Sequence, residues 1–195
     1  MKKGRILRFT QIAILTALVV VLQLLSYVIK IGTFPLSLVL IPLVVGGALF
    51  GPRAGGFLGL VFGVVVTIGC ITGFDVGGAI LWNVNPFLTA LVCLVKGAVA
   101  GFIGGLIATI LQKKGHSFLG VLLSAIVVPL VNTGLFTAAM WFLFKETLVS
   151  WAGGQNVVYY VFFGLIGINF VIEFVINLVL APTSERIVNV IRHTK

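Results

Sequence analysis

Long apolar segments separated by short turns occupy nearly the whole of this 195-residue chain. A helix needs roughly 20 apolar residues to cross a bilayer core about 30 Å thick, and most of these segments approach that length. With 60% hydrophobic and only 9% charged residues, the chain has too little polar surface to form a globule in water. The sequence therefore predicts a protein whose solvent is lipid.

Turn-forming residues divide the apolar sequence into six predicted transmembrane helices within a single domain, residues 1–195. The predicted spans cover about residues 9–29, 36–50, 55–71, 87–111, 118–144 and 157–181. The connections after the first, third and fifth spans look irregular, and the stretch from Thr72 to Pro86 looks the least helical. The expected fold class is an all-α membrane protein, a six-transmembrane-helix bundle.

Basic residues are concentrated on one side of this predicted bundle. Lys30 and Lys145 lie on the opposite side, and Lys96 lies within the fourth span. Because short cytoplasmic loops are enriched in Lys and Arg, we expect both termini in the cytoplasm and the irregular connections 1–2, 3–4 and 5–6 outside. The other ten basic residues, all on the predicted cytoplasmic side, are Lys2, Lys3, Arg5, Arg8, Arg53, Lys113, Lys114, Arg186, Arg192 and Lys195.

Several function classes are not supported by the sequence. The net charge of +9 does not indicate a nucleic-acid partner, because the basic residues stand at helix ends without interleaved aromatic residues. The sequence contains no metalloprotease, serine hydrolase or P-loop motif, so we predict that it is not an enzyme and that any ATP-driven work comes from a partner. Cys70 and Cys93 have no second ligand nearby in the sequence, and we predict neither a metal site nor a cofactor.

Polar side chains recur at similar depth in three of the predicted helices. Lys96 lies about 15 Å below the outer end of the fourth span and Asn132 about 20 Å from the inner end of the fifth, so both are near the membrane midplane. Asn169 and Glu173 are four residues apart and share one face of the sixth span. Polar groups at this depth are costly and face a cavity or one another. Lys96 therefore pairs with Glu173 or attracts a ligand carboxylate, and the two roles can coexist. Asn132 and Asn169 either bridge helices or bind that ligand.

The segment from Thr72 to Pro86 adds a second group of candidates near the outer surface. Trp82 offers a flat apolar wall, and Asn83 and Asn85 offer directional hydrogen bonds, which together suit a small amphipathic ligand. Tryptophan is also enriched at membrane interfaces without any ligand, so Trp82 can equally be an anchor. We predict capture of a small molecule, with these substrate-binding residues: Trp82, Asn83, Asn85, Lys96, Asn132, Asn169 and Glu173.

Small residues repeat at four-residue spacing in several predicted helices, a pattern that lets helix backbones approach closely in lipid. Ala13 and Ala17, near the cytoplasmic end of the first span, form a smooth stripe that either packs internally or receives a helix of another subunit. Two glycine triplets are expected to pack internally: Gly55, Gly59 and Gly63, and Gly97, Gly101 and Gly105.

The order and spacing of these motifs resemble a known family. The first span carries Ala13-Ile-Leu-Thr-Ala17, an A-x-x-x-A motif, and Phe50-Gly51-Pro52-Arg53-Ala-Gly55 is similar to an F-G-P-x-x-G turn. Phe34-Pro35, Asn85-Pro86, Asn132-Thr133 and the stretch 169–182 fit the same order. The chain thus resembles the substrate-binding S components of energy-coupling factor (ECF) transporters, which import vitamins into bacteria.

The resemblance implies a multi-pass protein of the bacterial cell membrane that binds a vitamin near the outer surface, capped by the loop between the first two spans. It also implies partners, namely a transmembrane coupling subunit that docks on Ala13 and Ala17, and two ATPase subunits. Pantothenate is the expected vitamin, because amides with one membrane-embedded lysine suit a small polar anion and the sequence looks closest to pantothenate-specific members. The alternatives are another vitamin (pyridoxine, hydroxymethylpyrimidine, riboflavin or folate) or a self-sufficient small secondary transporter.

Overall fold

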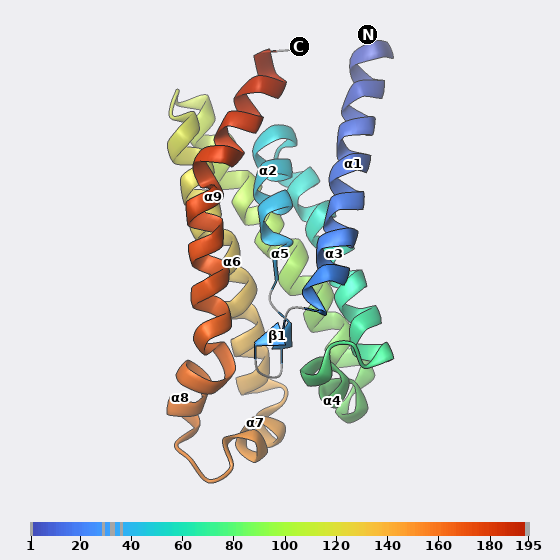
Figure 1. The fold of residues 1–195 in the computed structure, drawn as a ribbon, viewed down its shortest axis with the longest axis vertical. Coiled ribbons are helices and arrows are strands. Elements are labelled where there is room, and N and C mark those ends of the chain that lie inside the picture. Colours follow the sequence, from blue (N-terminus) through green and yellow to red (C-terminus); the bar gives the residue numbers. More distant parts are fainter. Residues whose placement is uncertain (1, 29, 32–33, 36, 194–195) are drawn as a thin grey trace.

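The computed structural model describes residues 2–28, 30–31, 34–35 and 37–193, which form an elongated helical bundle (Figure 1). Both termini, the α2–α3 turn and the α5–α6 turn lie at the same end of this bundle. The predicted helical architecture is therefore confirmed, while the side of the membrane on which that end lies stays a prediction. The main helices are α1 (Lys2–Ser26), α2 (Leu40–Phe50), α3 (Pro52–Thr72), α5 (Pro86–Lys113), α6 (Ser117–Phe142) and α9 (Gly167–His193).

The helices that are long and apolar enough to cross a membrane are fewer than the six predicted spans. Within the described residues, four single helices have this length and composition: Arg5–Ser26, Pro52–Thr72, Pro86–Lys113 and Ser117–Phe142. A fifth is a bent pair, Val157–Leu165 with Asn169–Ile191, whose two parts meet at 45°. α2 is apolar but has only 11 residues, and at 1.5 Å per residue it covers about half of a bilayer core. The sixth span therefore stays a prediction.

The connection between the third and fourth predicted spans is helical, which corrects the expectation of an irregular segment there. It forms α4 (Val76–Val84), and the Asp75 side chain caps its first turn by accepting a hydrogen bond from the Gly78 N–H at 2.9 Å. A side chain on Gly78 would overlap the sulfur of Cys70, so the glycine lets α4 pack directly against α3. The cap and this close contact stabilise a helix that the glycine pair and Pro86 argued against in the sequence.

The remaining two predicted loops also contain regular structure. α7 (Lys145–Ala152) occupies most of the polar loop before the last span, so the expectation of an irregular 5–6 connection is wrong as well. Between α1 and α2, the two-residue strands β1 (Lys30–Ile31) and β2 (Phe34–Pro35) pair antiparallel.

α3 and α5 pack against each other through their glycines, so the predicted internal packing of the glycine triplets is confirmed and the structure adds which helices meet. A Cβ atom on Gly59 would overlap the backbone carbonyl of Gly97, and one on Gly97 would overlap the carbonyl of Gly59. Gly55 and Gly101 oppose each other in the same way one turn further along. Close backbone approach of this kind is a main source of helix association in lipid.

The last span is broken rather than continuous. α8 (Val157–Tyr159) leads into the π-helical η1 (Tyr160–Ile166), and Gly167, with φ of 20°, then begins α9. α9 continues past Pro182 to His193, so the basic tail beyond the predicted span is helical up to that residue. The two parts of the last span meet at an angle of 45°, and α8 lies at the end of the bundle that also carries α7 (Figure 1).

Candidate ligand-binding site

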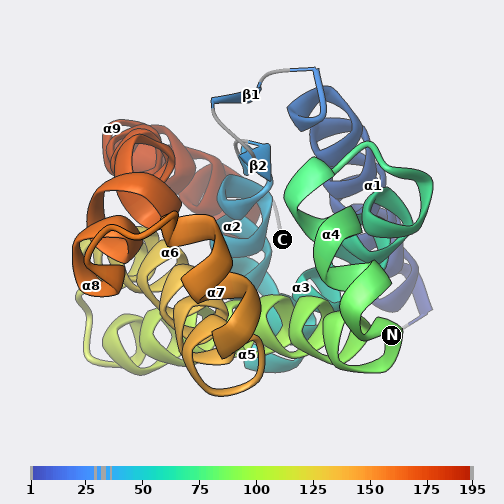
Figure 2. The ribbon, with the colours of Figure 1, turned by 90° about the horizontal axis from the view of Figure 1, so that it is seen from below.

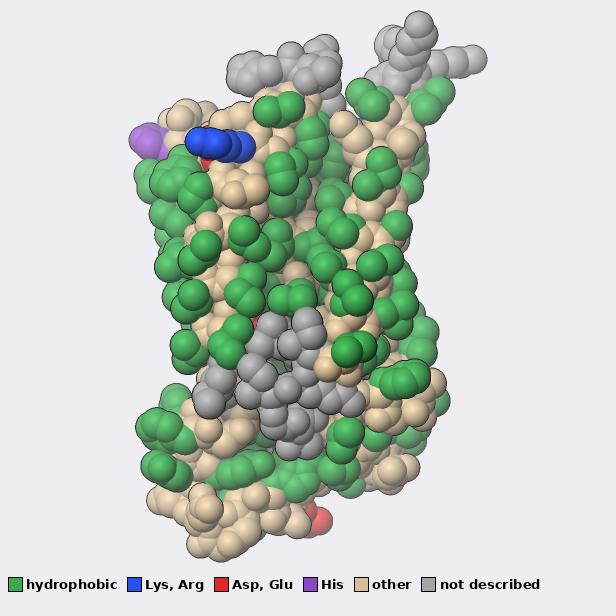
Figure 3. Space-filling view, viewed as in Figure 1, with side chains coloured by type: hydrophobic (Ala, Val, Ile, Leu, Met, Phe, Trp, Pro, Cys, Tyr) green, Lys and Arg blue, Asp and Glu red, His purple; other side chains and the backbone are tan. Residues whose placement is uncertain are grey.

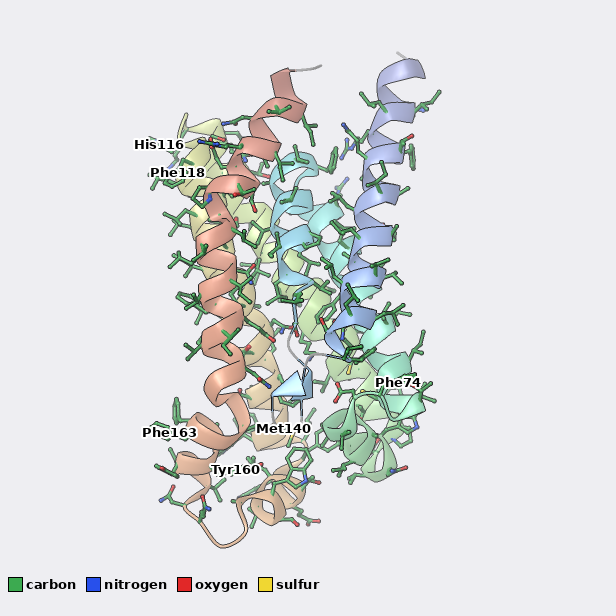
Figure 4. All side chains as sticks on the ribbon, viewed as in Figure 1. Phe74, His116, Phe118, Met140, Tyr160 and Phe163 are labelled. Carbon is green, nitrogen blue, oxygen red and sulfur yellow. The ribbon has the colours of Figure 1, made fainter. Side chains whose placement is uncertain are left out.

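A cavity of about 80 Å³ lies between α1, α3, α5, α6 and α9. Figure 4 shows Met140, one of the residues that line it, in the half of the bundle away from His116 and the chain termini. A buried site needs roughly 10–15 Å³ by this measure to hold one water, so the cavity has room for several waters or a small ligand. Four of the residues predicted to bind substrate line it together: Lys96, Asn132, Asn169 and Glu173.

Lys96 brings a positive charge from α5 into this cavity. Its Nζ atom lies 5.0 Å from the centroid of the Phe136 ring and 5.9 Å from that of Phe62. Ring faces attract a cation without neutralising it, so the ammonium keeps its charge for a further partner. Within the described residues Lys96 forms no ion pair with Glu173, although both side chains line the same cavity. The predicted ion pair is therefore not formed within the described residues, and attraction of a ligand by Lys96 stays a prediction.

Glu173 is hydrogen-bonded to the chain segment that leads into α2. Its Oε1 atom accepts a hydrogen bond from the backbone N–H of Ser37 at 2.6 Å, and the side chain is only 6% exposed. The neighbouring Leu38 N–H is 3.4 Å from the hydroxyl oxygen of Ser26 at the end of α1. Glu173 therefore ties the connection between α1 and α2 to α9 at the edge of the cavity.

Amide side chains also line the cavity, together with the polar side chains of Asp75, Thr89 and Thr133. Asn132 is 4% exposed, and its Oδ1 atom has no hydrogen-bond partner among the described residues. Asn169 enters from α9 beside Glu173. The sequence analysis missed Gln23 of α1, which is 1% exposed and also lines the cavity. Gln23, like Asn132, is an amide within an apolar run, and that pattern could have identified it from the sequence.

Trp82, Asn83 and Asn85 are not among the residues that line the cavity. Trp82 packs against the apolar core, and Asn83 is exposed near the end of α4. The Asn85 side chain caps α5 by accepting a hydrogen bond from the Leu88 N–H at 3.0 Å. The structure thus separates these three residues from the four that meet, and their contact with a ligand stays a prediction.

Ala13 and Ala17 lie on the exposed side of α1, whereas Val19 and Gln23 face the bundle. Arg8 holds the same end of the helix in place, with its guanidinium donating to the Phe50 carbonyl at 3.1 Å. The alanine stripe is therefore not used for packing within the described part of the chain. It remains open to lipid or to another subunit.

The surface of the bundle suits a lipid environment. Figure 3 shows hydrophobic side chains along the flanks of the helices, with Lys, Arg and His side chains gathered at the end that carries the termini. Among the described residues no group of three or more His, Cys, Asp or Glu side chains could hold a metal ion.

Comparison with known proteins agrees with this architecture. Residues 7–184 match a family model described as ECF transporter, substrate-specific component, which is a family of transporters and not of enzymes. The chain is also similar to the pantothenic acid transporter PanT of Lactococcus lactis subsp. cremoris, at 28% identity over 158 residues that cover 76% of this chain and 79% of the relative. The chain therefore belongs to the family of substrate-specific components of ECF transporters, and it is a multi-pass protein of the bacterial cell membrane that serves vitamin uptake.

Proposed function

We propose that this chain captures pantothenate at the outer face of the membrane and delivers it to a transport complex. The observation that carries the proposal is the ammonium group of Lys96, which lines a membrane-embedded cavity with amide side chains around it and no carboxylate paired to it in the described residues. A half-buried charge at membrane depth is costly unless an anion joins it. A bound carboxylate removes that cost.

The chemistry of pantothenate matches the groups in the cavity. The vitamin carries one carboxylate for Lys96, and its amide and two hydroxyl groups can hydrogen-bond to side chains such as Asn132 and Asn169. Pyridoxine, hydroxymethylpyrimidine and riboflavin have no carboxylate. Folate has carboxylates, but it is a much larger molecule than pantothenate. The similarity to a pantothenic acid transporter points in the same direction.

The proposal includes partners, because the sequence contains no P-loop to hydrolyse ATP. A transmembrane coupling subunit docks on the exposed Ala13 and Ala17 face of α1, and two ATPase subunits supply the energy. The exposure of this small-residue stripe supports the idea, since such stripes let a second helix approach closely in a membrane.

Calorimetric titration of the purified chain in lipid nanodiscs tests the proposal. The ligands are pantothenate, pyridoxine, hydroxymethylpyrimidine, riboflavin and folate, and we expect one-to-one binding with pantothenate the tightest. Vesicles that contain only this chain should show no pantothenate uptake when an ion gradient is applied. Preference for another vitamin would overturn the assigned substrate, and gradient-driven uptake by the isolated chain would instead indicate a self-sufficient transporter.

A further inference from the structure

Gln23 is the most deeply buried polar side chain on α1 that reaches the cavity. It is 1% exposed, it lines the cavity together with Lys96 and Asn132, and its Oε1 atom has no hydrogen-bond partner among the described residues. A buried amide oxygen without a donor destabilises the folded protein. A ligand that donates a hydrogen bond to this oxygen removes that cost.

Tyr27 determines which end of the Gln23 side-chain amide is available to a ligand. The Tyr27 hydroxyl donates its proton to the Val65 carbonyl at 2.9 Å, so toward Gln23 its oxygen can only accept. The Gln23 side chain interacts with this hydroxyl, and only its NH₂ group can donate to the Tyr27 oxygen. The amide oxygen is the end that remains for a ligand.

We infer that the Gln23 side-chain oxygen accepts a hydrogen bond from a hydroxyl or amide N–H group of the bound ligand, so that α1 contributes directly to the binding site. The inference rests on the proposed capture of pantothenate and extends it to a contact that the resemblance did not include. In this arrangement the carboxylate of the ligand lies at Lys96, and a hydrogen-bond donor of the ligand lies at Gln23 on α1.

The placement of the helices makes this contact useful for specificity. In the view along the bundle, α1 and α6 lie on opposite sides of α2 (Figure 2). Gln23 on α1 and Asn132 on α6 both present buried oxygens without a described partner to the same cavity. A ligand that satisfies both must carry at least two donor groups, which pantothenate has and simple carboxylates lack. Small fatty acids and other apolar anions are therefore excluded, because they would leave both oxygens unpaired.

The chain supplies a matched control on the same helix. Gln11 also has a buried side-chain oxygen with no partner among the described residues, but it does not line the cavity. Replacing either glutamine by leucine removes one unpaired amide and keeps the side-chain size similar. Gln23→Leu should weaken pantothenate binding at least about tenfold, the effect of losing one hydrogen bond to a buried group, whereas Gln11→Leu should change it less than about threefold.

Ligand analogues identify the donor that Gln23 contacts. Affinities of the wild-type chain and Gln23→Leu are measured by calorimetry for pantothenate, its two deoxy analogues and an N-methylated analogue. One analogue should bind wild type weakly and be insensitive to Gln23→Leu, because the same hydrogen bond is already absent. Melting of the ligand-free variants by thermal shift shows whether each is folded, and Gln23→Met replaces Gln23→Leu should the latter fail to fold.

The outcomes separate this inference from the proposed function. Wild-type protein that binds no pantothenate overturns both. Wild-type protein that binds pantothenate, with Gln23→Leu and Gln11→Leu equally mild, overturns only the role of Gln23, since a water then satisfies its oxygen. Equal sensitivity of all analogues to Gln23→Leu would likewise contradict a direct contact.

Discussion

Lys96 shows how a single residue sets the chemistry of the cavity. Its aliphatic stem suits an apolar helix, and two aromatic rings hold the ammonium without cancelling its charge. The acidic group that could have neutralised it, Glu173, accepts a hydrogen bond from the Ser37 N–H instead. Lys96 therefore offers a ligand carboxylate one positively charged partner in a cavity that Asp75 and Glu173 also line.

Replacing Lys96 by methionine tests this attraction. Lys96→Met keeps an unbranched apolar chain and removes the charge, so affinity for pantothenate should fall about 10- to 100-fold, in line with the roughly 1.5–3 kcal/mol of a hydrogen bond to a charged group. The measurement is calorimetric titration of both proteins in nanodiscs.

Pantothenol provides the control for Lys96→Met, because it replaces the carboxylate with a neutral alcohol. Its affinity should be nearly the same for wild type and variant. An equal loss for both ligands would mean that Lys96 supports the shape of the cavity rather than the charge of the ligand.

At the level of helices, the α3–α5 contact depends on glycines that leave no room for a Cβ atom. Gly59 and Gly97 face each other backbone to backbone, and the same two helices carry Phe62 and Lys96, which line the cavity. Packing of the two helices and the shape of the site are therefore linked.

Gly59→Ala should destabilise the protein by about 1–3 kcal/mol, because the added methyl group overlaps the Gly97 carbonyl and forces the helices apart. Gly134→Ala in α6 is the control, since a Cβ there meets no atom within 4 Å and the higher helix propensity of alanine should leave stability unchanged or raised. Thermal unfolding in detergent compares them. Equal melting temperatures for the two variants would refute the close-packing account.

The exposed face of α1 calls for a different kind of test. Ala17→Trp should abolish co-purification with the coupling subunit while leaving pantothenate affinity unchanged, because Ala17 faces away from the bundle. Leu25→Trp places the same bulk on another exposed position of α1 and should leave the complex intact. Weakened vitamin binding in Ala17→Trp would show that the stripe packs internally.

Over the whole molecule, apolar flanks and one basic end define an orientation in the membrane. Arg53, Lys113 and Lys114 lie at the end where both termini are found, and Lys145 lies at the other (Figure 1). The rule that cytoplasmic loops are basic predicts that the first end lies inside the cell. The cavity then lies in the outer half of the bundle.

Site-directed labelling of cells checks this orientation. Lys114→Cys and Gln155→Cys each put one thiol on an exposed turn, at opposite ends of the bundle. A membrane-impermeant maleimide added to intact cells should label only Gln155→Cys, and should label both variants after permeabilisation. The native Cys70 and Cys93 are buried, so the unmodified chain serves as the background control. Labelling of Lys114→Cys in intact cells would reverse the topology.

The sequence by itself determined the properties that depend on local composition and period. Apolar length predicted lipid as the solvent and located the long helices, glycine spacing predicted that the two glycine triplets pack internally, and polar residues in apolar runs identified Lys96, Asn132 and Asn169. The motifs at Ala13 and at Phe50-Gly51-Pro52 pointed to the family that the comparison then showed. These signals are readable because each lies within one helix or one turn.

Only the tertiary structure decided which partners distant residues find. Glu173 accepts a hydrogen bond from Ser37, 136 positions away, rather than pairing with Lys96. Asp75 caps a helix where glycine and proline predicted a loop, and Gln23 reaches the cavity because α1 packs that side against α3. Contacts of this kind depend on how the helices are arranged around one another, and no spacing within a single helix records that arrangement.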